Sequence, residues 1–300
     1  MHFVTFTHDG CERAGILLGE AEHPEDTILD LAHPAYREAM QGTEPRMLAM
    51  IGSGLHACAT RLADVEPPAS ARLRVDAVRL CAPLPNPPRI FGAAHNFTCA
   101  LEERGMECPD EPVVFAKAPS TIAGPGADIL LPAVGGCTYE AELAAVIGKR
   151  CSEVGASEAL DHVAGYMIFN DISASEIIRA EGNFQRGKNF PTFGPCGPFL
   201  ATADEIPDPQ DLDIELRVDD VIRQRGSTRM MLFNVAQLVS ILSQTTELHP
   251  GDMIATGTPA GVAAVQKPPN WLQAGQRVSI RITGLGSLVN QIVAEEAANA

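Results

Sequence analysis

Two acidic side chains separated by one residue lie in a run with the composition of a β-strand. They are Glu140 and Glu142, and the apolar residues 143–147 follow them. Side chains two positions apart on a strand share a face, so these carboxylates can converge on one cation. An isolated pair of this kind is more often a solvated strand face. The pair therefore indicates a metal site only if another ligand joins it.

A third carboxylate, Asp171, occurs where an apolar run gives way to a helix expected over 172–180. Three carboxylates supply oxygen ligands, which suit Mg²⁺, Mn²⁺ or Ca²⁺ better than zinc. The competing interpretation is an Asx turn or helix cap, because Ser173 and Glu176 have the spacing of a capping box. The spacing alone leaves both interpretations open.

A lysine, Lys188, lies in the Gly- and Pro-rich segment 187–198. Residues 182–188 imitate the phosphate-loop pattern G-x-x-x-x-G-K, but Asn189 stands where that motif needs Ser or Thr, and a helix rather than a strand precedes it. We therefore reject nucleotide binding. A loop lysine is usually a solvated charge, yet beside a carboxylate-held cation it would stabilise a developing enolate or oxyanion.

The order of the motifs resembles the fumarylacetoacetate hydrolase superfamily over residues 88–295. The resemblance includes the E-x-E strand, the N-D-x-S-A segment at 170–174, the lysine loop with its Gly-Pro pair, and the run P-G-D-x-I-x-T-G-T-P-x-G at 250–261. Segments 115–117, 224–228 and 272–276 also match. The resemblance implies an α+β, predominantly β fold with a mixed β-roll or β-sandwich core, a homodimer, and divalent-metal chemistry on 2-oxo acids and their enols.

The resemblance also assigns roles to individual residues. It implies that Glu140, Glu142 and Asp171 bind the metal and that Lys188 supports the reacting oxygens. The expected cofactor is Mg²⁺ or Mn²⁺, with Ca²⁺ able to replace it in crystals. Chelation of a 2-oxo carboxylate by the metal withdraws electrons, so a carbanion beside the ketone would be stored as a metal-bound enolate.

Three further residues match positions near the substrate. Thr192 matches a threonine close to the metal, and Lys117 and Thr258 match positions that line the substrate pocket. An ammonium and a hydroxyl there would hold a carboxylate.

The chain departs from the family pattern in the expected lid, residues 94–108. Many members carry N-Y-x-x-H-x-x-E there, whereas Ala100 occupies the position of the histidine and Glu103 that of the glutamate. His95 lies just upstream and can act as the base only if the loop is rebuilt; otherwise it is a loop histidine without a catalytic part. Cys99 as a nucleophile beside His95 is a weaker interpretation than a buried, inert thiol.

A second departure follows Asp171. Hydrolases of this family often show S-A-R-D-x-Q, but Ser175 and Ile178 stand in place of the arginine and glutamine. Arg179, one turn further along the expected helix, is the candidate replacement. We expect Arg179 to contact substrate rather than metal.

The resemblance implies hydrolysis of a C–C bond in an acylpyruvate- or fumarylacetoacetate-like substrate, as in the breakdown of aromatic compounds. Loss of a general base costs about 10²- to 10⁴-fold in rate, which affects hydrolysis more than steps that need only enolate stabilisation. Isomerisation or tautomerisation, decarboxylation and dehydration of a related 2-oxo acid are therefore alternatives. A catalytically degenerate metal-binding or scaffold protein is a further one.

The elements that must position these residues follow from local patterns. Residues 214–218, 278–282 and 288–293 are apolar-patterned strands, and residues 172–180 and 235–244 are helices. An apolar stretch at 47–62 has helical periodicity. Prolines at 67–68 and 83–88 predict a boundary between a small α/β N-terminal domain, 1–75, and a catalytic domain, 76–300.

The overall composition narrows the class of protein. The chain has 300 residues, of which 45% are hydrophobic and 20% charged, so it is an ordinary folded protein rather than a disordered one. Its net charge of −16 excludes nucleic acid and anionic membranes as favoured partners. The eight cysteines form no C-x-x-C pair, and no signal or long apolar segment is evident, so we expect a reduced, cytoplasmic protein whose partner is a small 2-oxo acid.

Overall fold

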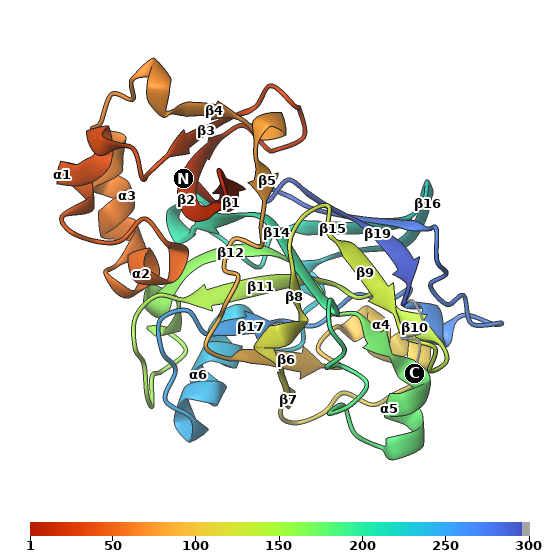
Figure 1. Ribbon diagram of the computed structural model, residues 1–300. Coiled ribbons are helices and arrows are strands. Elements are labelled where there is room, and N and C mark those ends of the chain that lie inside the picture. The colour runs from red at the N-terminus through yellow and green to blue at the C-terminus, as the bar shows by residue number, and fades with distance from the viewer. Residues whose placement is uncertain (296–300) are drawn as a thin grey trace.

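The computed structural model describes residues 1–295, and β-strands dominate it (Figure 1). The expectation of a predominantly β, α+β fold is confirmed. The central strands of the largest sheet are buried along their whole length because apolar clusters cover both of their faces. On the strand that carries Glu142, Leu143 and Ile147 belong to one cluster, whereas Ala144 and Val146 belong to the other. Successive side chains along this strand therefore pack alternately into the two apolar clusters.

The largest sheet has twelve strands in the order β4-β3-β2-β1-β14-β12-β11-β17-β6-β7, and β5 and β8 pair with β1 and β14. Most neighbours are antiparallel, but β17 runs parallel to β6. The strands are β1 (His2–His8), β2 (Cys11–Leu18), β3 (Thr27–Asp30), β4 (Arg72–Arg74), β5 (Arg79–Leu80), β6 (Ile90–Ala94), β7 (Val113–Lys117), β8 (Ile122–Ala123), β11 (Ala141–Ile147), β12 (Val163–Asn170), β14 (Gly194–Thr202) and β17 (Met253–Ala255).

Two smaller sheets complete the β structure. The five-stranded one has the order β16-β15-β18-β19-β9, and the alternating burial of β15 and β18 shows that one face packs on the core. Its strands are β9 (Asp128–Leu131), β15 (Asp213–Val218), β16 (Val221–Ser227), β18 (Arg277–Ile282) and β19 (Ser287–Ala294). They confirm the three strands expected from the sequence. The two-stranded sheet pairs β10 (Cys137–Thr138) with β13 (Ser173–Ala174).

The helices are short and lie around the sheets. Val235 begins the helix expected over 235–244, and Asn234 and Gln237 form its capping box. The apolar stretch 47–62 forms two helices, because Gly54 adopts φ +94° between them. The α-helices are α1 (Arg37–Met40), α2 (Met47–Gly52), α3 (Leu55–Ala63), α4 (Thr98–Arg104), α5 (Ser175–Glu181) and α6 (Val235–Thr245). The 3₁₀ turns are η1 (Pro34–Tyr36), η2 (Ala69–Ala71), η3 (Val75–Ala77), η4 (Pro119–Thr121), η5 (Ala159–His162), η6 (Ala203–Glu205), η7 (Thr228–Met230) and η8 (Ala263–Val265).

The capping box of Ser173 and Glu176, which was the competing interpretation of this segment, does not form. The helix begins at Ser175 after Ala174, whose side chain cannot cap it. Glu176 instead accepts a hydrogen bond at Oε2 from the Gly136 amide, at 2.7 Å, and so ties α5 to the segment before β10. A contact between segments 40 residues apart has therefore replaced the local one.

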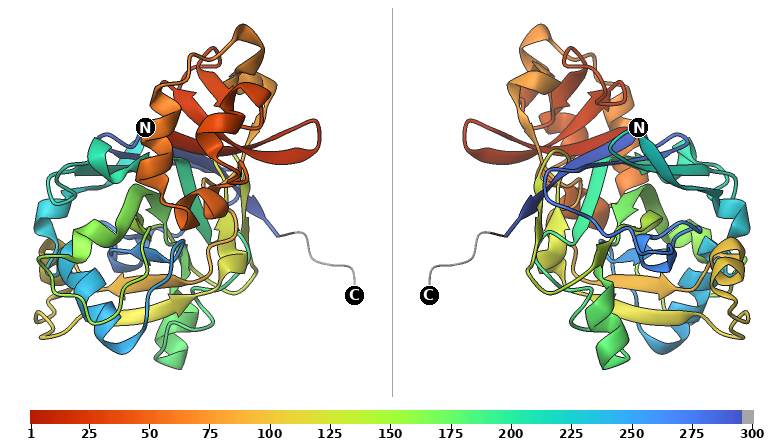
Figure 2. Two further views of the ribbon diagram at one scale, coloured as in Figure 1. Left: turned by 90° about the vertical axis from the view of Figure 1, so that its left-hand side faces the viewer. Right: turned by 90° about the vertical axis from the view of Figure 1, so that its right-hand side faces the viewer.

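The N-terminal strands extend the main sheet. β1 pairs with β14, where His2 and Phe3 lie opposite Ala201 and Leu200, and helices α1, α2 and α3 gather beside β1–β4 (Figures 1 and 2). The sheet therefore continues from the residues assigned to the N-terminal domain into those assigned to the catalytic domain. The boundary near residue 75 stays a prediction, and the last residues of the second domain, 296–300, lie outside the described part. No helix in residues 1–295 is long and apolar enough to cross a membrane.

Candidate metal centre and its pocket

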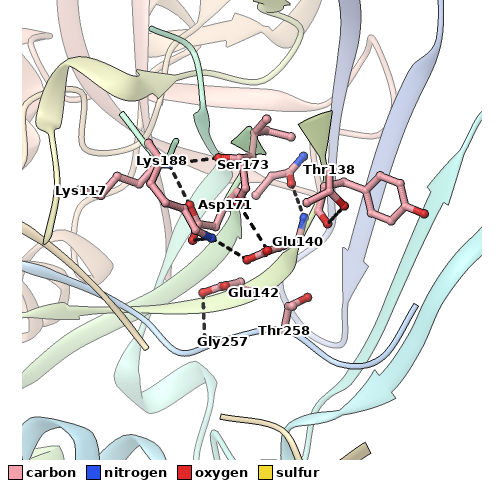
Figure 3. A network of polar contacts seen from close by, with 12 residues as sticks. Lys117, Thr138, Glu140, Glu142, Asp171, Ser173, Lys188, Gly257 and Thr258 are labelled. Carbon is pink, nitrogen blue, oxygen red and sulfur yellow. Dashed lines mark hydrogen bonds and ion pairs between the residues drawn. The ribbon is translucent and has the colours of Figure 1, made fainter. Parts of the chain in front are cut away.

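Strand register brings the three predicted carboxylates together. Ala141 of β11 lies opposite Asn170 of β12. Beyond that pair, the Glu140 amide donates to Asn170 Oδ1 (3.1 Å) and the Asp171 amide donates to the Glu140 carbonyl (3.0 Å). As a result, one oxygen from each of Glu140, Glu142 and Asp171 lies within 4.8 Å of the others (Figure 3).

Two lysine ammonium groups contact this acidic cluster. Lys188 Nζ donates to Asp171 Oδ2 at 2.5 Å and to Glu140 Oε2 at 2.8 Å. Lys117 Nζ donates to Asp171 Oδ1 at 2.8 Å and to the Lys188 carbonyl at 2.5 Å. Both carboxylate oxygens of Asp171 therefore accept hydrogen bonds from lysine ammonium groups. Lys188 Nζ also lies over the Phe115 ring, 5.0 Å from the ring centroid.

The loop after β17 supports the remaining carboxylate. Glu142 Oε2 accepts from the Gly257 amide at 2.9 Å. Gly257 has φ +92°, and a Cβ there would lie 2.8 Å from the Ala93 carbonyl, so this position requires glycine. The Thr258 hydroxyl donates to the Ala141 carbonyl and accepts from Gln224, which fixes the loop along β11.

Burial and charge shift the pKa values of this cluster in different directions. Burial raises the pKa of Glu142, and the charges of Asp171 and Glu140 raise it further. Burial alone would raise the pKa of Asp171 too, but Lys117 and Lys188 bring it below its usual range. Burial would lower the pKa of Lys188, yet the three carboxylates raise it, so its ammonium stays charged at neutral pH. The pKa of Lys117 is lowered, mainly by burial.

The donor set fits a hard divalent cation. Two of the three carboxylates are buried and the third, Glu140, is partly accessible, so a cation would have carboxylate ligands on one side and the pocket on the other. Burial and the charges of Asp171 and Glu140 raise the pKa of Glu142, and a bound divalent cation would favour its ionised form. Glu140, Glu142 and Asp171 are therefore the residues that would bind Mg²⁺ or Mn²⁺.

A cavity of about 290 Å³ opens beside the cluster. Its polar wall includes Glu140, Glu142, Lys188, Thr138, Ser173 and Thr258. Its apolar wall includes Phe115, Phe184, Ile178, Val262 and Val265. Arg104, Arg179 and His95 also line it. The arrangement can take a small molecule that presents oxygen atoms at one end and carbon along its length.

Residues of the expected lid take different positions around this pocket. His95 lines it with φ +59°, and its buried Nδ1 has no hydrogen-bond partner within the described residues. Burial lowers the pKa of His95, and the charges of Arg104 and Lys188 lower it further. Ala100 is buried in the core with 1% exposure. Glu103 is exposed, and its Oε2 accepts from the Gly261 amide at 3.0 Å.

The residues predicted from the sequence therefore fall into two groups. Around the cavity lie Glu140, Glu142, Lys188, Thr258, Arg179 and His95, with Asp171 in the acidic cluster beside it. Lys117, expected to line the pocket, is buried outside the lining, and its ammonium contacts Asp171 instead. Glu103 and Thr192 are outside the lining; the Thr192 hydroxyl accepts from the Leu130 amide at 2.9 Å and borders a different cavity.

Sequence reasoning missed Arg104 and Ser173 as pocket residues. Ser173 Oγ lies 3.4 Å from Glu140 Oε1 and donates to the Asp171 carbonyl at 3.0 Å. Its place in the N-D-x-S-A segment was an available signal. Arg104 directly follows Glu103, but nothing in its local pattern distinguishes it from a solvated helix-end arginine.

Comparison with known proteins agrees with this geometry. The family model for the fumarylacetoacetate (FAA) hydrolase C-terminal domain matches residues 89–293. A Burkholderia cenocepacia protein named only as a hydrolase is 48% identical over 201 residues, which are 66% of this chain and 71% of the relative.

Two solved structures extend the comparison over nearly the whole chain. A 2-hydroxyhepta-2,4-diene-1,7-dioate isomerase from Mycobacterium marinum is 28% identical with a TM-score of 0.77, covering 99% of this chain and 100% of its own. A maleylpyruvate hydrolase from Sphingobium sp. SYK-6, in complex with manganese(II) and pyruvate, is 29% identical with a TM-score of 0.77 and the same coverage.

Proposed function

Because the chain belongs to the fumarylacetoacetate hydrolase family, we propose that it is a Mg²⁺- or Mn²⁺-dependent enzyme that hydrolyses a C–C bond in an acylpyruvate-like 2-oxo acid. One observation carries the proposal: three carboxylates and the Lys188 ammonium converge at one end of a cavity whose other walls are largely apolar. The manganese and pyruvate of the Sphingobium hydrolase support the same class of ligand.

The metal would act as a Lewis acid toward the 2-oxo carboxylate. Lys188 supplies a fixed positive charge where oxygens of the substrate gain negative charge during the reaction. Its pKa is raised by Asp171, Glu140 and Glu142 against the effect of burial, so it donates hydrogen bonds and does not abstract a proton at neutral pH. Lys117 acts through Asp171, whose carboxylate it holds in the ionised form.

His95 is the residue that we assign as general base toward water. Its pKa is lowered by burial and by the nearby cations, so the neutral imidazole that can accept a proton predominates at neutral pH. It lines the cavity, and its Nδ1 has no acceptor or donor among residues 1–295. Glu103, bonded to the Gly261 amide, is instead proposed to hold α4 against the loop after β17.

A second candidate function, isomerisation of an enol or dienol dicarboxylate, follows from the lid. Ala100 stands at the position of the family's lid histidine and is buried in the core. In hydrolysis, activation of the attacking water would therefore depend on His95 alone. Proton transfer between carbon and oxygen needs enolate stabilisation but no attacking water. The Mycobacterium relative is named as an isomerase of this kind.

The test is a substrate panel for the purified protein with Mn²⁺ or Mg²⁺. Acetylpyruvate, fumarylpyruvate and oxaloacetate are followed by ultraviolet absorbance, and products are identified by proton NMR. We expect cleavage of an acylpyruvate that stops with chelator and returns with metal. Tautomerisation or decarboxylation without hydrolytic cleavage of the acylpyruvate would favour the alternative reactions. No turnover despite metal binding would contradict catalysis.

The variant His95→Gln separates hydrolysis from isomerisation. Loss of a general base should reduce hydrolysis by about 10²- to 10⁴-fold and leave metal affinity unchanged. His23→Gln, at an exposed histidine in the N-terminal segment, is the matched control. Equal hydrolysis in both variants would remove His95 from the mechanism.

A further inference from the structure

Three aromatic rings line one part of the pocket, and they come from three separate segments. His95 directly follows β6, Phe115 lies on β7, and Phe184 lies in the segment after α5. The ring centroids of Phe115 and Phe184 are 5.0 Å apart, and those of Phe184 and His95 are 6.4 Å apart. Aromatic rings at such separations interact through their faces and edges. We refer to these three side chains as the aromatic wall.

The rings of the aromatic wall are only half-buried, unlike the aromatic side chains of the core. Phe97 and Phe193 are fully buried and belong to the larger apolar cluster. Within residues 1–295, Phe115 and Phe184 belong to neither apolar cluster and line the cavity instead. Their accessible apolar surface forgoes the free energy that full burial would give. A ligand that covers the rings would recover it.

The backbone of the neighbouring strand makes room for Phe115. Gly92 of β6 lies opposite Phe115 in the register of β6 and β7. A Cβ atom on Gly92 would lie 2.2 Å from Phe115 Cζ, so any other residue there would displace the ring. Gly92 does not have a positive φ, so space rather than backbone conformation requires glycine at this position. The position of the Phe115 ring in the pocket therefore depends on a glycine in the adjacent strand.

Aliphatic side chains extend the apolar surface beside the rings. Ile178 of α5 belongs to the same lining, as do Val262 and Val265. Gly187 makes room for Ile178, because a Cβ atom there would lie 2.4 Å from Ile178 Cγ1. These side chains offer no hydrogen bonds, so this part of the cavity fits hydrocarbon.

The arginines of the lining are compatible with a flat hydrocarbon ligand. Arg104 and Arg179 also border the cavity. A planar guanidinium stacks on aromatic faces. An aryl ring in this part of the pocket can therefore contact all the side chains found there.

The aromatic wall lies next to the metal end of the pocket. Lys188 Nζ is 5.0 Å from the centroid of the Phe115 ring, and the same ammonium donates to Glu140 and Asp171. One ammonium group thus separates the nearest ring from the carboxylates of the acidic cluster. A ligand held at the metal end needs only a short chain to reach the rings.

We propose that the aromatic wall binds an aryl group at the acyl end of the substrate, so that the enzyme selects aroylpyruvates (2,4-dioxo-4-arylbutanoates) over acylpyruvates with a saturated group of similar size. This inference rests on the proposed function, which supplies the 2-oxo acid for the metal end. Contacts between aromatic rings are favourable beyond the burial of apolar area, whereas a saturated ring gains only the burial.

The products of such a substrate follow from the proposed hydrolysis. The bond between the aroyl carbon and the adjacent CH₂ group breaks, and its electron pair leaves with the pyruvate enolate, which takes up a proton. Water supplies the hydroxyl group of the arenecarboxylic acid. The products are therefore pyruvate and an arenecarboxylate.

The experiment compares two ligands that cannot be hydrolysed, by titration calorimetry on the Mn²⁺-loaded protein. They are 2-oxo-4-phenylbutanoate and 4-cyclohexyl-2-oxobutanoate, which carry a flat or a saturated ring at the position of the aryl group in an aroylpyruvate. A pocket that selects by apolar burial alone would prefer the cyclohexyl ligand. We expect the wild-type protein to prefer the phenyl ligand by about 2- to 12-fold, the size of an aromatic contact. Pyruvate, which has no ring, is the reference ligand.

Variants of the two phenylalanines test the source of the preference. Phe115→Leu and Phe184→Leu should each lower it, because they remove a ring but keep an apolar side chain. The double variant should bind the two ring ligands equally, while its affinity for pyruvate stays within about twofold. Phe190→Leu is the matched control, since Phe190 is half-buried, lies 5.3 Å from the Phe193 ring centroid and is outside the lining. Circular dichroism and thermal melting verify the fold of each variant.

The outcomes separate this inference from the function on which it rests. Equal or tighter binding of the cyclohexyl ligand by the wild-type protein, or an unchanged preference in the double variant, overturns the aryl site. Binding of pyruvate without either ring ligand overturns it too, and leaves the 2-oxo acid assignment standing. Failure of pyruvate and both ring ligands to bind the Mn²⁺-loaded wild-type protein overturns the 2-oxo acid assignment and this inference together.

Discussion

The metal end of the pocket and its lid end are built in different ways. At the metal end, Glu142, Asp171, Lys117 and Lys188 are almost fully buried, and each makes a hydrogen bond that fixes its charged group. At the lid end, His95 and Arg104 are half-buried. Within residues 1–295, the Nδ1 atom of His95 has no hydrogen-bond partner and Arg104 forms no ion pair. In the first set, Glu142 and Lys117 lie on strands, Asp171 directly follows β12, and Lys188 lies in a turn, whereas the second set is carried by a loop and a seven-residue helix.

This difference shows where chemistry and specificity reside. A buried network that is fully satisfied is costly to alter, because every removed partner leaves another charge unpaired. Unpaired side chains on a short helix can be substituted without disturbing the core. We therefore expect changes at the metal end to affect catalysis as a whole and changes at the lid end to affect substrate preference.

The largest effect is expected at Glu142. Glu142→Gln preserves an acceptor for the Gly257 amide but removes a ligand charge, so Mn²⁺ affinity should fall by more than about 100-fold and turnover with it. Calorimetric titration with Mn²⁺ and the substrate assay measure both. Glu158→Gln, on an exposed turn, should change neither. Full Mn²⁺ affinity in Glu142→Gln would disprove the metal assignment.

Lys188 separates metal binding from turnover. Lys188→Met should lower kcat by about 10²- to 10³-fold, as expected for removal of a fixed positive charge at a developing oxyanion. Mn²⁺ affinity should not fall, because the ammonium competes with the cation for Glu140 and Asp171. The exposed Lys149→Met is the control. Parallel loss of metal and turnover would make Lys188 a structural part of the metal site.

The pH profile tests the lid end. The pKa of His95 lies below 6.5 because of burial and the charges of Arg104 and Lys188. A neutral imidazole is needed to accept a proton, so kcat/KM should decline as the pH falls through this pKa. Arg104→Met removes one opposing charge and should move the acid limb to higher pH. Acetylpyruvate is the substrate, and an unmoved limb would exclude His95 as the base.

The smallest effect on turnover is expected from restoring the family histidine. Ala100→His places a larger polar ring in a buried site, so the free energy of unfolding should fall by about 1–3 kcal/mol without a gain in hydrolysis. Urea unfolding and the substrate assay measure the two quantities. Glu102→His, on the exposed face of α4, serves as control. Faster hydrolysis in Ala100→His would show that α4 turns this position toward the pocket.

Much of the metal end could be predicted from sequence, because period-two spacing and motif order are local properties. Glu142 lies on β11 and Glu140 directly precedes that strand, and their resemblance to a family motif brought in Asp171. Other features depend on contacts that local patterns do not contain. Thr192 contacts Leu130 instead of the pocket, and Glu176 accepts a hydrogen bond from a distant amide instead of capping its own helix. Arg104 lines the same cavity as residues of α5, which its local sequence pattern does not indicate.

The pairing of β1 with β14 has a thermodynamic consequence. Strand β14 also pairs with β12, and β12 pairs with β11, the strand of Glu142. Hydrogen-bonded strands therefore connect the N-terminal residues of β1 to the candidate metal site. Removing residues 1–75 would uncover the ladder groups of β14 and part of a shared apolar cluster. We therefore expect one cooperative heat-absorption peak for the whole chain, with bound Mn²⁺ raising the melting temperature of strands far from the ion.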